Sequence, residues 1–196
     1  MGKSERNIAI GLFALFILLL LFFGFLKVKE KILKETSVYI FLTKQENNQT
    51  LIMPVQRKIG FYGKSIQNKV ESAIKELIKG PTEEEKKEGF STSLNENTRL
   101  LNVSIEGDTV NLDFSKEVEE GGGTLLMESR IAQIVYTATQ FEGIKKVRFL
   151  IEGKNIDYFS GEGITIVEKP IGREDLAEFD IKIIEEEGKN EKGNTS

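Results

Sequence analysis

The side chains best suited to chemistry are carboxylates that surround a glycine-rich stretch in the second half of the chain. Carboxylate oxygens are the ligands that Mg²⁺ and Ca²⁺ prefer, and five of them could gather around one cation: Asp108, Asp113, Glu117, Glu119 and Glu120. Their spacing does not follow that of an EF-hand loop. We therefore interpret them as solvated turn charges, with Asp113 on the outward face of a strand, and we predict no metal site.

Two further stretches could bind or cut a ligand. Gly121, Gly122 and Gly123 precede a predicted helix, where backbone N–H groups could hold an anion. A P-loop also needs a Lys and a Ser/Thr at fixed spacing, and these are missing, so a flexible loop is the favoured interpretation. The acidic run at residues 83–88 could supply the paired carboxylates of a glycosidase. Its spacing does not indicate convergence in a cleft, and a charged helical cap is simpler.

The composition excludes many kinds of enzyme. It contains neither histidine nor cysteine. Without histidine it lacks the commonest general base and the commonest neutral metal ligand. Without cysteine it has no disulfide, thiolate metal site or thiol nucleophile. The net charge of −4, with no obvious basic stripe, argues against a nucleic-acid partner. We predict no catalytic residues and no cofactor, and therefore a protein that is not an enzyme.

The longest amphipathic pattern outside the N-terminus covers residues 124–143 and predicts a helix. Its apolar residues recur at steps of four, three, four and three, so they share one face: Met127, Ile131, Ile134, Ala138 and Phe141. The polar residues between them are expected to face solvent: Glu128, Arg130, Gln133, Thr137 and Gln140. A helix with one apolar stripe needs a partner, and we expect a sheet to cover it.

Strands and a second helix are predicted on both sides of this helix. Residues 37–43 are apolar on both faces, which indicates a buried strand, and residues 51–59 form a second extended segment. In that segment Pro54 favours an edge or a bulge. Apolar residues at helical spacing predict a helix from Ser65 to Gly80, after which Thr82 and three glutamates have the spacing of a capping box.

The clearest hairpin joins residues 99–106 to residues 109–114 through Gly107 and Asp108, a pair suited to a type II′ turn. Apolar residues alternate along both strands: Leu101, Val103 and Ile105 on the first, and Val110, Leu112 and Phe114 on the second. Residues 145–152 form another strand. The order predicts an α+β fold with a β-α-β-β-α-β core, in which two helices pack on one face of a sheet.

A long apolar segment precedes this core. Residues 8–26 carry no charged or amide side chain, and at about 1.5 Å per residue they extend about 28 Å, close to a bilayer's roughly 30 Å. A cleaved signal peptide is the alternative, but residues 23–27 offer no small-residue cleavage site. We predict an uncleaved transmembrane signal anchor. Lysines and arginine on both sides leave its orientation open.

Four blocks of this sequence resemble the GerMN domain, a family named after a germination and sporulation protein. They are AIKELIKGPT at residues 73–82, TRLLNV at 98–103, VNLDFS at 110–115 and IVYTATQF at 134–141. The resemblance spans residues 39–170. The positions that match the family pattern are expected to be structural: Gly80, Pro81, Thr82, Leu101, Val103, Asp113, Ser115, Thr137, Thr139, Gln140, Phe141 and Gly143.

The resemblance implies a fold like that of ring-building motifs, a place in the bacterial envelope and no established catalysis. It also implies an extracytoplasmic domain, which orients the anchor. The chain has one copy of the domain where the founding member has two, and it lacks the lipoprotein cysteine of many relatives.

These expectations divide the chain into five parts. They are a cytoplasmic N-terminus (1–7), the anchor (8–26), a stalk (27–36), the GerMN-like domain (37–170) and a C-terminal extension (171–196), disordered from about 185. We expect a single-pass protein of the cell membrane. Its partners would be the membrane, through residues 8–26, and other envelope proteins or further copies of itself. The alternative is a sensing domain that binds a cell-wall or lipid-derived small molecule beside the helix of residues 124–143.

Overall fold

The computed structural model describes residue 2 and residues 11–24, 33–62, 65–159 and 164–184. A helix occupies residues 11–24, and the other residues of the predicted anchor lie outside the described ones. Within the described ranges, no helix combines the length and the apolar character needed to cross a membrane. The tail expected to be disordered from about residue 185 also falls outside the described residues.

The folded domain begins with a long β-hairpin. β1 (Leu33–Glu46) and β2 (Gln49–Tyr62) pair antiparallel along their whole length. Both strands are longer than predicted, and β1 starts inside the segment expected to be a stalk. Asn47 and Asn48 close the hairpin with φ angles of 51° and 61°. Two consecutive positive φ angles define a type I′ turn, which asparagine tolerates. The polar stretch between the two predicted strands, residues 44–49, therefore turns only at Asn47 and Asn48, and its other residues belong to the strands.

The first helix and its ends agree with the sequence. α2 (Ile66–Lys79) begins after Ser65 and ends at Gly80, whose φ is 73°. Its buried face comprises Val70, Ala73, Ile74 and Leu77, whereas Ile66 in the first turn is 38% exposed. α3 (Glu83–Lys87) follows at once. The capping box is confirmed, because the Thr82 hydroxyl accepts from the Glu85 N–H and the Glu85 carboxylate accepts from the Thr82 N–H.

The second hairpin is also confirmed. β4 (Leu100–Glu106) and β5 (Thr109–Phe114) pair antiparallel, and Gly107 between them has a φ of 62°. β6 (Lys146–Ile151) then pairs parallel with β5. A two-residue strand, β7 (Lys154–Asn155), folds back on β6.

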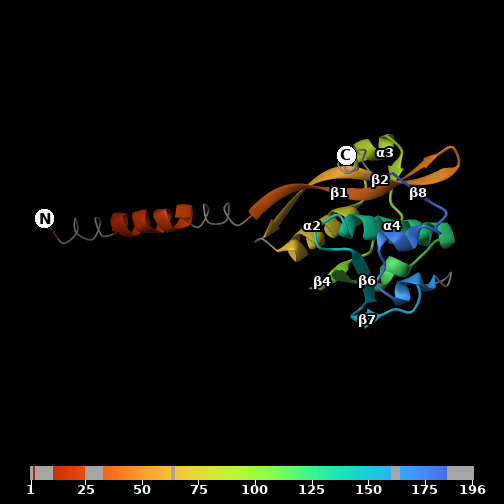
Figure 1. Ribbon diagram of the computed structural model, residues 1–196. Coiled ribbons are helices and arrows are strands. Elements are labelled where there is room, and N and C mark those ends of the chain that lie inside the picture. Colours follow the sequence, from red (N-terminus) through yellow and green to blue (C-terminus); the bar gives the residue numbers. More distant parts are fainter. Residues whose placement is uncertain (1, 3–10, 25–32, 63–64, 160–163, 185–196) are drawn as a thin grey trace, which may run out of the picture.

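The domain is mixed α+β, but the prediction of one sheet with both helices on one face is wrong. The strands form two sheets, in the orders β3-β1-β2-β8 and β4-β5-β6-β7, where β3 is Phe90–Ser91 and β8 is Lys182–Ile183. α2 contacts β1, β2 and β4, and α4 (Thr124–Ala138) contacts β1, β2 and β6. Figure 1 shows the helices between the two sheets. β3 and side chains of α4 occupy the outer edge of β1.

One hydrophobic core joins the layers. It contains residues of both sheets and both helices, among them Ile40, Ile74, Leu112, Ile131 and Phe149. The segment after β7 adds to it through two 3₁₀ turns, at Thr165–Glu168 and Arg173–Leu176, whose Val167 and Leu176 are buried. Residues 164–184 therefore pack on the same domain.

Pro54 limits the pairing between β2 and β8. β8 runs parallel to β2 at Leu51 and Ile52, and the Ile184 N–H donates to the Ile52 carbonyl at 2.9 Å. The next N–H on this side of β2 would belong to Pro54, which has none. β2 therefore cannot donate the next bond of this ladder, as expected of a proline at an edge.

Candidate functional site

The positions that match the family pattern do not converge on one cleft. They lie in three places: the corner between α2 and α3, the β4–β5 hairpin, and the C-terminal half of α4 with the turn that follows it. What these side chains touch decides whether they bind a ligand or hold the fold.

At the corner between α2 and α3, Gly80 and Thr82 shape the backbone. A Cβ atom on Gly80 would lie 3.2 Å from the Thr92 side chain, and its φ of 73° favours glycine. Pro81 then prevents the helix from continuing. Glu85, the capping residue, forms a bidentate ion pair with Arg57 of β2, and both side chains are only 14% exposed. The corner therefore fastens α3 to the first sheet.

This ion pair predicts a pH-dependent contribution to stability. Hydrogen bonds from Arg57 hold the pKa of Glu85 below its usual range, although burial acts in the opposite direction. A carboxylate with a lowered folded-state pKa stabilises the fold above its unfolded pKa, and this stabilisation is lost as the pH falls through the folded value. We expect Glu85→Gln to lower the free energy of unfolding by about 1 kcal/mol at pH 7. The deficit should shrink below about pH 4.3.

Urea titrations of the wild type and the variant between pH 7 and pH 2 measure this difference. Glu83→Gln is the control, because the Glu83 side chain is 76% exposed and its pair with Lys86 lies at the surface. We expect the control to leave stability nearly unchanged. A Glu85→Gln deficit that stays constant down to pH 2 would contradict the assignment.

In the β4–β5 hairpin, the family positions face different ways. Leu101 was expected to alternate regularly with Val103, but the register shifts between Leu100 and Asn102 and leaves Leu101 49% exposed. This is a β-bulge, in which one extra residue breaks the alternation. Val103 is buried, as its pattern predicts.

Asp113 and Ser115 bind backbone groups. The Asp113 carboxylate accepts from the Gly153 N–H at 2.9 Å, in the turn between β6 and β7. The Ser115 hydroxyl accepts from the Arg99 N–H at 3.0 Å and is buried. Both side chains therefore hold neighbouring chain segments in place.

Along α4, two family positions bind the edge of β1. The Thr137 hydroxyl accepts from the Phe41 N–H at 3.2 Å. The Gln140 amide accepts from the Tyr39 N–H at 2.8 Å and donates to the Tyr39 carbonyl at 2.6 Å. These backbone groups belong to the outer edge of β1, which pairs with β3 only at Thr43 and Lys44. The helix therefore supplies the hydrogen bonds that a neighbouring strand would make.

Gln133 completes this row, although it was not among the family positions. Its amide accepts from the Ser93 N–H at 2.8 Å and donates to the Phe41 carbonyl at 2.8 Å. It thus inserts between β1 and the segment that leaves β3, just where the strands stop pairing. We call Gln133, Thr137 and Gln140 the edge ladder. Gln133 and Thr137 are fully buried, so the prediction that they face solvent is wrong.

The end of α4 is held by a second set of contacts. Thr139 donates to the Val135 carbonyl at 2.7 Å and accepts from the Arg173 Nε at 2.9 Å. The Arg173 guanidinium also stacks on the Tyr136 ring at 4.4 Å. A cation at a helix C-terminus complements the helix dipole.

The last two family positions shape the turn after α4. Phe141 packs against the apolar cluster of Val38, Ile59 and Ala73. Gly143 adopts a φ of 86°, a conformation that favours glycine. The turn after α4 therefore packs Phe141 against apolar residues of β1, β2 and α2.

Arg130 is the largest side chain that is fully buried among the described residues, at 1% exposure. The expectation that it faces solvent is therefore wrong. Its guanidinium donates to three backbone carbonyls, those of Ser93, Val118 and Glu120. Burial lowers the pKa of Arg130 to about 10, so the side chain is still charged at neutral pH. Arg130 fastens the loop before α4 to the segment after β3.

The acidic residues singled out as possible cation ligands do not form a cluster. Within the described ranges, no three acidic side chains lie where they could hold a metal ion. Asp113 is occupied by the Gly153 N–H. A hydrogen bond with Ser115 lowers the pKa of Glu117. In α3, Glu85 forms the cap and pairs with Arg57, and Glu83 forms a surface ion pair with Lys86.

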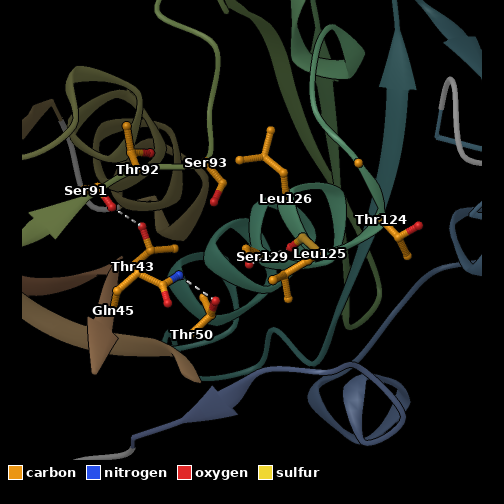
Figure 2. Close-up of a pocket in the computed structure, with 11 residues that line it drawn as sticks. Thr43, Gln45, Thr50, Ser91, Thr92, Ser93, Thr124, Leu125, Leu126 and Ser129 are labelled. Atoms are coloured by element: carbon orange, nitrogen blue, oxygen red, sulfur yellow. Dashed lines mark hydrogen bonds between the residues drawn. The ribbon is translucent and has the colours of Figure 1, made fainter. Parts of the chain in front are cut away.

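A groove of about 440 Å³ opens beside the N-terminal end of α4 (Figure 2). Its walls come from the tip of the β1–β2 hairpin, from residues 91–93 and from the first turn of α4. No charged side chain lines it, and most of the lining residues carry a hydroxyl group. Some hydroxyls bind one another: Thr43 pairs with Ser91 at 2.8 Å, and Thr50 accepts from the Gln45 amide at 2.6 Å.

Two polar groups of the groove, the Ser93 hydroxyl and the Leu125 N–H, have no partner within the described part of the chain. The Ser93 hydroxyl belongs to a residue that is 6% exposed, and it points into the space between Thr43 and Leu126 (Figure 2). Gly123, the N-cap of α4, offers no side chain to the first turn, and no described group accepts from the Leu125 N–H. Sequence patterns gave no signal for Ser93, because residues 91–95 follow no helix or strand period.

Comparison with known proteins identifies the class to which this two-sheet α+β domain belongs. The family model Germane, described as sporulation and spore germination, matches residues 37–157. The match covers more than half of the chain, and the chain belongs to this family. The resemblance to the GerMN domain is thereby confirmed. No curated protein matches the chain.

Three solved structures have a similar fold. A Clostridium perfringens protein described as a lipoprotein is 25% identical, with a TM-score of 0.52 over 76% of this chain and 93% of that one. The tandem GerMN domains of the Bacillus subtilis sporulation protein GerM are 21% identical, with a TM-score of 0.55 over 76% and 48% of the two chains. The first of those domains alone is 22% identical, with a TM-score of 0.54 over 71% and 98%. This chain therefore matches about half of the tandem protein.

Proposed function

We propose that this chain is a non-catalytic, membrane-anchored envelope protein whose extracytoplasmic GerMN domain mediates protein–protein assembly. The processes would be sporulation, germination or maintenance of the cell envelope. The family supports the proposal, as do the relatives described as a sporulation protein and a lipoprotein. The apolar segment at residues 8–26 supports the anchor, and the lack of histidine and cysteine supports a role other than catalysis.

The observation that carries the assembly role is the outer edge of β2, which no described strand covers after Ile52. Gln56 lies opposite Tyr39, and Lys58 lies opposite Ser37. The N–H and carbonyl of Tyr39 both bind Gln140, away from β2, so Tyr39 and Gln56 form a non-hydrogen-bonded pair. The N–H groups of Gln56 and of Lys58, two residues on, therefore point outward. No group in the described part of the chain accepts from them.

The other long edges make contacts over part of their length. β1 has β3 and the edge ladder, and Gln67 of α2 donates to the Val103 carbonyl on the outer side of β4. Ile171 bridges to Val147 of β6. An uncovered sheet edge is a template on which a partner can add a strand. The partner would be another envelope protein or a further copy of this chain.

Site-specific photo-crosslinking of the full-length protein in whole cells tests this role. A photoreactive amino acid at position 56 should give a discrete adduct, with twice the mass of the chain if the partner is a second copy. The control is position 106, since Glu106 is also exposed but lies at the far tip of β4. Absence of an adduct at position 56, or equal labelling at both positions, would count against assembly through this edge.

A second candidate function is ligand sensing outside the cytoplasm. The groove beside α4 favours it, because the groove holds polar groups that the fold leaves without partners. A small molecule derived from the cell wall or from lipid would be the ligand.

A further inference from the structure

The groove beside α4 presents hydrogen-bond donors in a fixed arrangement. The backbone around Ser93 is held on both sides, because its N–H binds Gln133 at 2.8 Å and its carbonyl binds Arg130 at 2.7 Å. The Ser93 hydroxyl is therefore positioned before any ligand arrives. Ser93 as a whole is largely buried, and its hydroxyl points into the groove without a partner from the described residues (Figure 2).

The start of α4 adds a positive potential to the same groove. The first N–H groups of a helix have no partner inside it, and they carry the positive end of the helix dipole. A side chain at the N-cap usually satisfies one of them, but the N-cap here is Gly123. The Leu125 N–H is consequently left without an acceptor from the described part of the chain.

The lining also limits the charge of the ligand. A phosphate dianion is usually met by arginine or lysine, and no basic residue lines the groove. No acidic residue lines it either, so a single negative charge meets no repulsion from the walls. Leu125 and Leu126, which are 43% and 37% exposed, form an apolar wall beside the helix end. A carboxylate attached to a small aliphatic group fits this combination.

We propose that the groove binds the C-terminal end of a short peptide. The carboxylate would lie at the first turn of α4 and the Ser93 hydroxyl, and a small aliphatic side chain would lie on Leu125 and Leu126. The volume of about 440 Å³ falls within the range of roughly 300 to 1,000 Å³ usual for small-ligand sites. This inference rests on the second candidate function. The assembly proposal is separate, because it concerns the edge of β2.

Matched peptide pairs test the proposal. N-acetyl-alanyl-alanine and its C-terminal amide are titrated calorimetrically into the purified full-length protein. We expect the acid to bind at least about tenfold more tightly than the amide, since only the acid carries the charge. Each pair is made from D-alanine and from L-alanine. Preference for the D form indicates a cell-wall peptide, and preference for the L form indicates a protein C-terminus.

Gly123→Asp provides the sharpest variant. A Cβ atom at position 123 meets nothing within 4 Å, and the φ of −90° suits any residue. The new carboxylate would cap α4 itself, so the melting temperature should rise while binding of the acid weakens at least about tenfold. Ser65→Asp is the control. Ser65 caps α2 and likewise makes no side-chain cap bond, so its variant should gain stability and bind normally.

The binding results either support or overturn the proposal. Selective binding of the acid that is lost in Gly123→Asp and weakened in Ser93→Ala, but kept in Ser65→Asp, supports the proposal. Equal affinity for acid and amide, no binding of either, or acid binding that survives Gly123→Asp overturns it. Crosslinking at position 56 is unaffected by any of these results, so the two proposals can fail independently.

Discussion

Replacement of Arg130 by methionine is expected to lower the free energy of unfolding by about 3 kcal/mol. Methionine fills the space of the arginine stem, so the loss comes mainly from hydrogen bonds. The carbonyls of Ser93, Val118 and Glu120 lose their donor. A hydrogen bond to a charged group contributes about 1.5 to 3 kcal/mol. The variant no longer buries a charge, which offsets part of the loss.

Urea unfolding of the full-length protein, followed by far-ultraviolet circular dichroism, measures this effect. Arg99→Met is the control, since the Arg99 side chain is 71% exposed and lies 4.0 Å from its nearest carboxylate. We expect the control to cost less than about 0.5 kcal/mol. Arg130→Lys should recover less than half of the loss, because one ammonium lacks the fork that reaches several carbonyls. A loss below about 1 kcal/mol in Arg130→Met would show that the guanidinium does not hold the loop.

The local structure could be predicted because short-range chemistry determines it. Gly80 and Pro81 end α2, Thr82 and Glu85 form a capping box, and Gly107 turns the second hairpin, all as the residue types require. The Asn47–Asn48 turn lies in the polar stretch between the two predicted strands, and its residue types favour a tight hairpin. The β-bulge at Leu101 carries no such sign, because a leucine at that position also fits a regular strand.

The division into two sheets could not be predicted from the same patterns. Alternating residues indicate strands but not which strands pair, since pairing depends on contacts distant in sequence. The error had a visible consequence on α4, where Arg130, Gln133 and Thr137 were assigned to a solvent face. The sequence held one contrary signal. Ala132, Val135 and Tyr136 lie off the predicted apolar stripe, and a helix that is apolar on several sides is buried all round.

Some residues of the candidate site could be predicted from the sequence and others could not. Thr137 and Gln140 were singled out through the family resemblance, and the structure places both on the edge of β1. Ser93 and Gln133 were not, because a hydroxyl or an amide in an irregular contact has no periodic pattern to reveal it. The groove likewise arises where three distant segments meet.

Replacement of Gln133 by leucine is expected to cost about 3 kcal/mol of stability. The Gln133 amide satisfies two buried backbone groups, the Ser93 N–H and the Phe41 carbonyl. Leucine satisfies neither, and each orphaned group costs about 1 to 3 kcal/mol. The apolar side chain regains part of this through burial. Thr137→Val removes one hydrogen bond, from the Phe41 N–H, and should cost only about 1 kcal/mol.

Hydrogen exchange resolved by residue separates this explanation from a general loss of packing. In Thr137→Val the Phe41 amide should exchange faster, whereas the Leu42 amide, whose neighbour in the ladder is Met53 of β2, should keep its protection. In Gln133→Leu the Ser93 amide should lose protection first. Uniform acceleration along β1 would contradict the edge ladder, because a loss of packing alone would not single out these amides.

The same variant bears on why, among the described residues, one edge of this sheet is closed and the other is open. Without Gln133, the Phe41 carbonyl joins the unpaired groups of an edge strand, so β1 acquires the property that β2 has at Gln56 and Lys58. Gln133→Leu should therefore associate at lower concentrations than the wild type, as measured by light scattering. If it unfolds more easily but associates no more than the wild type, the side chains of α4 stabilise the domain without protecting its edge.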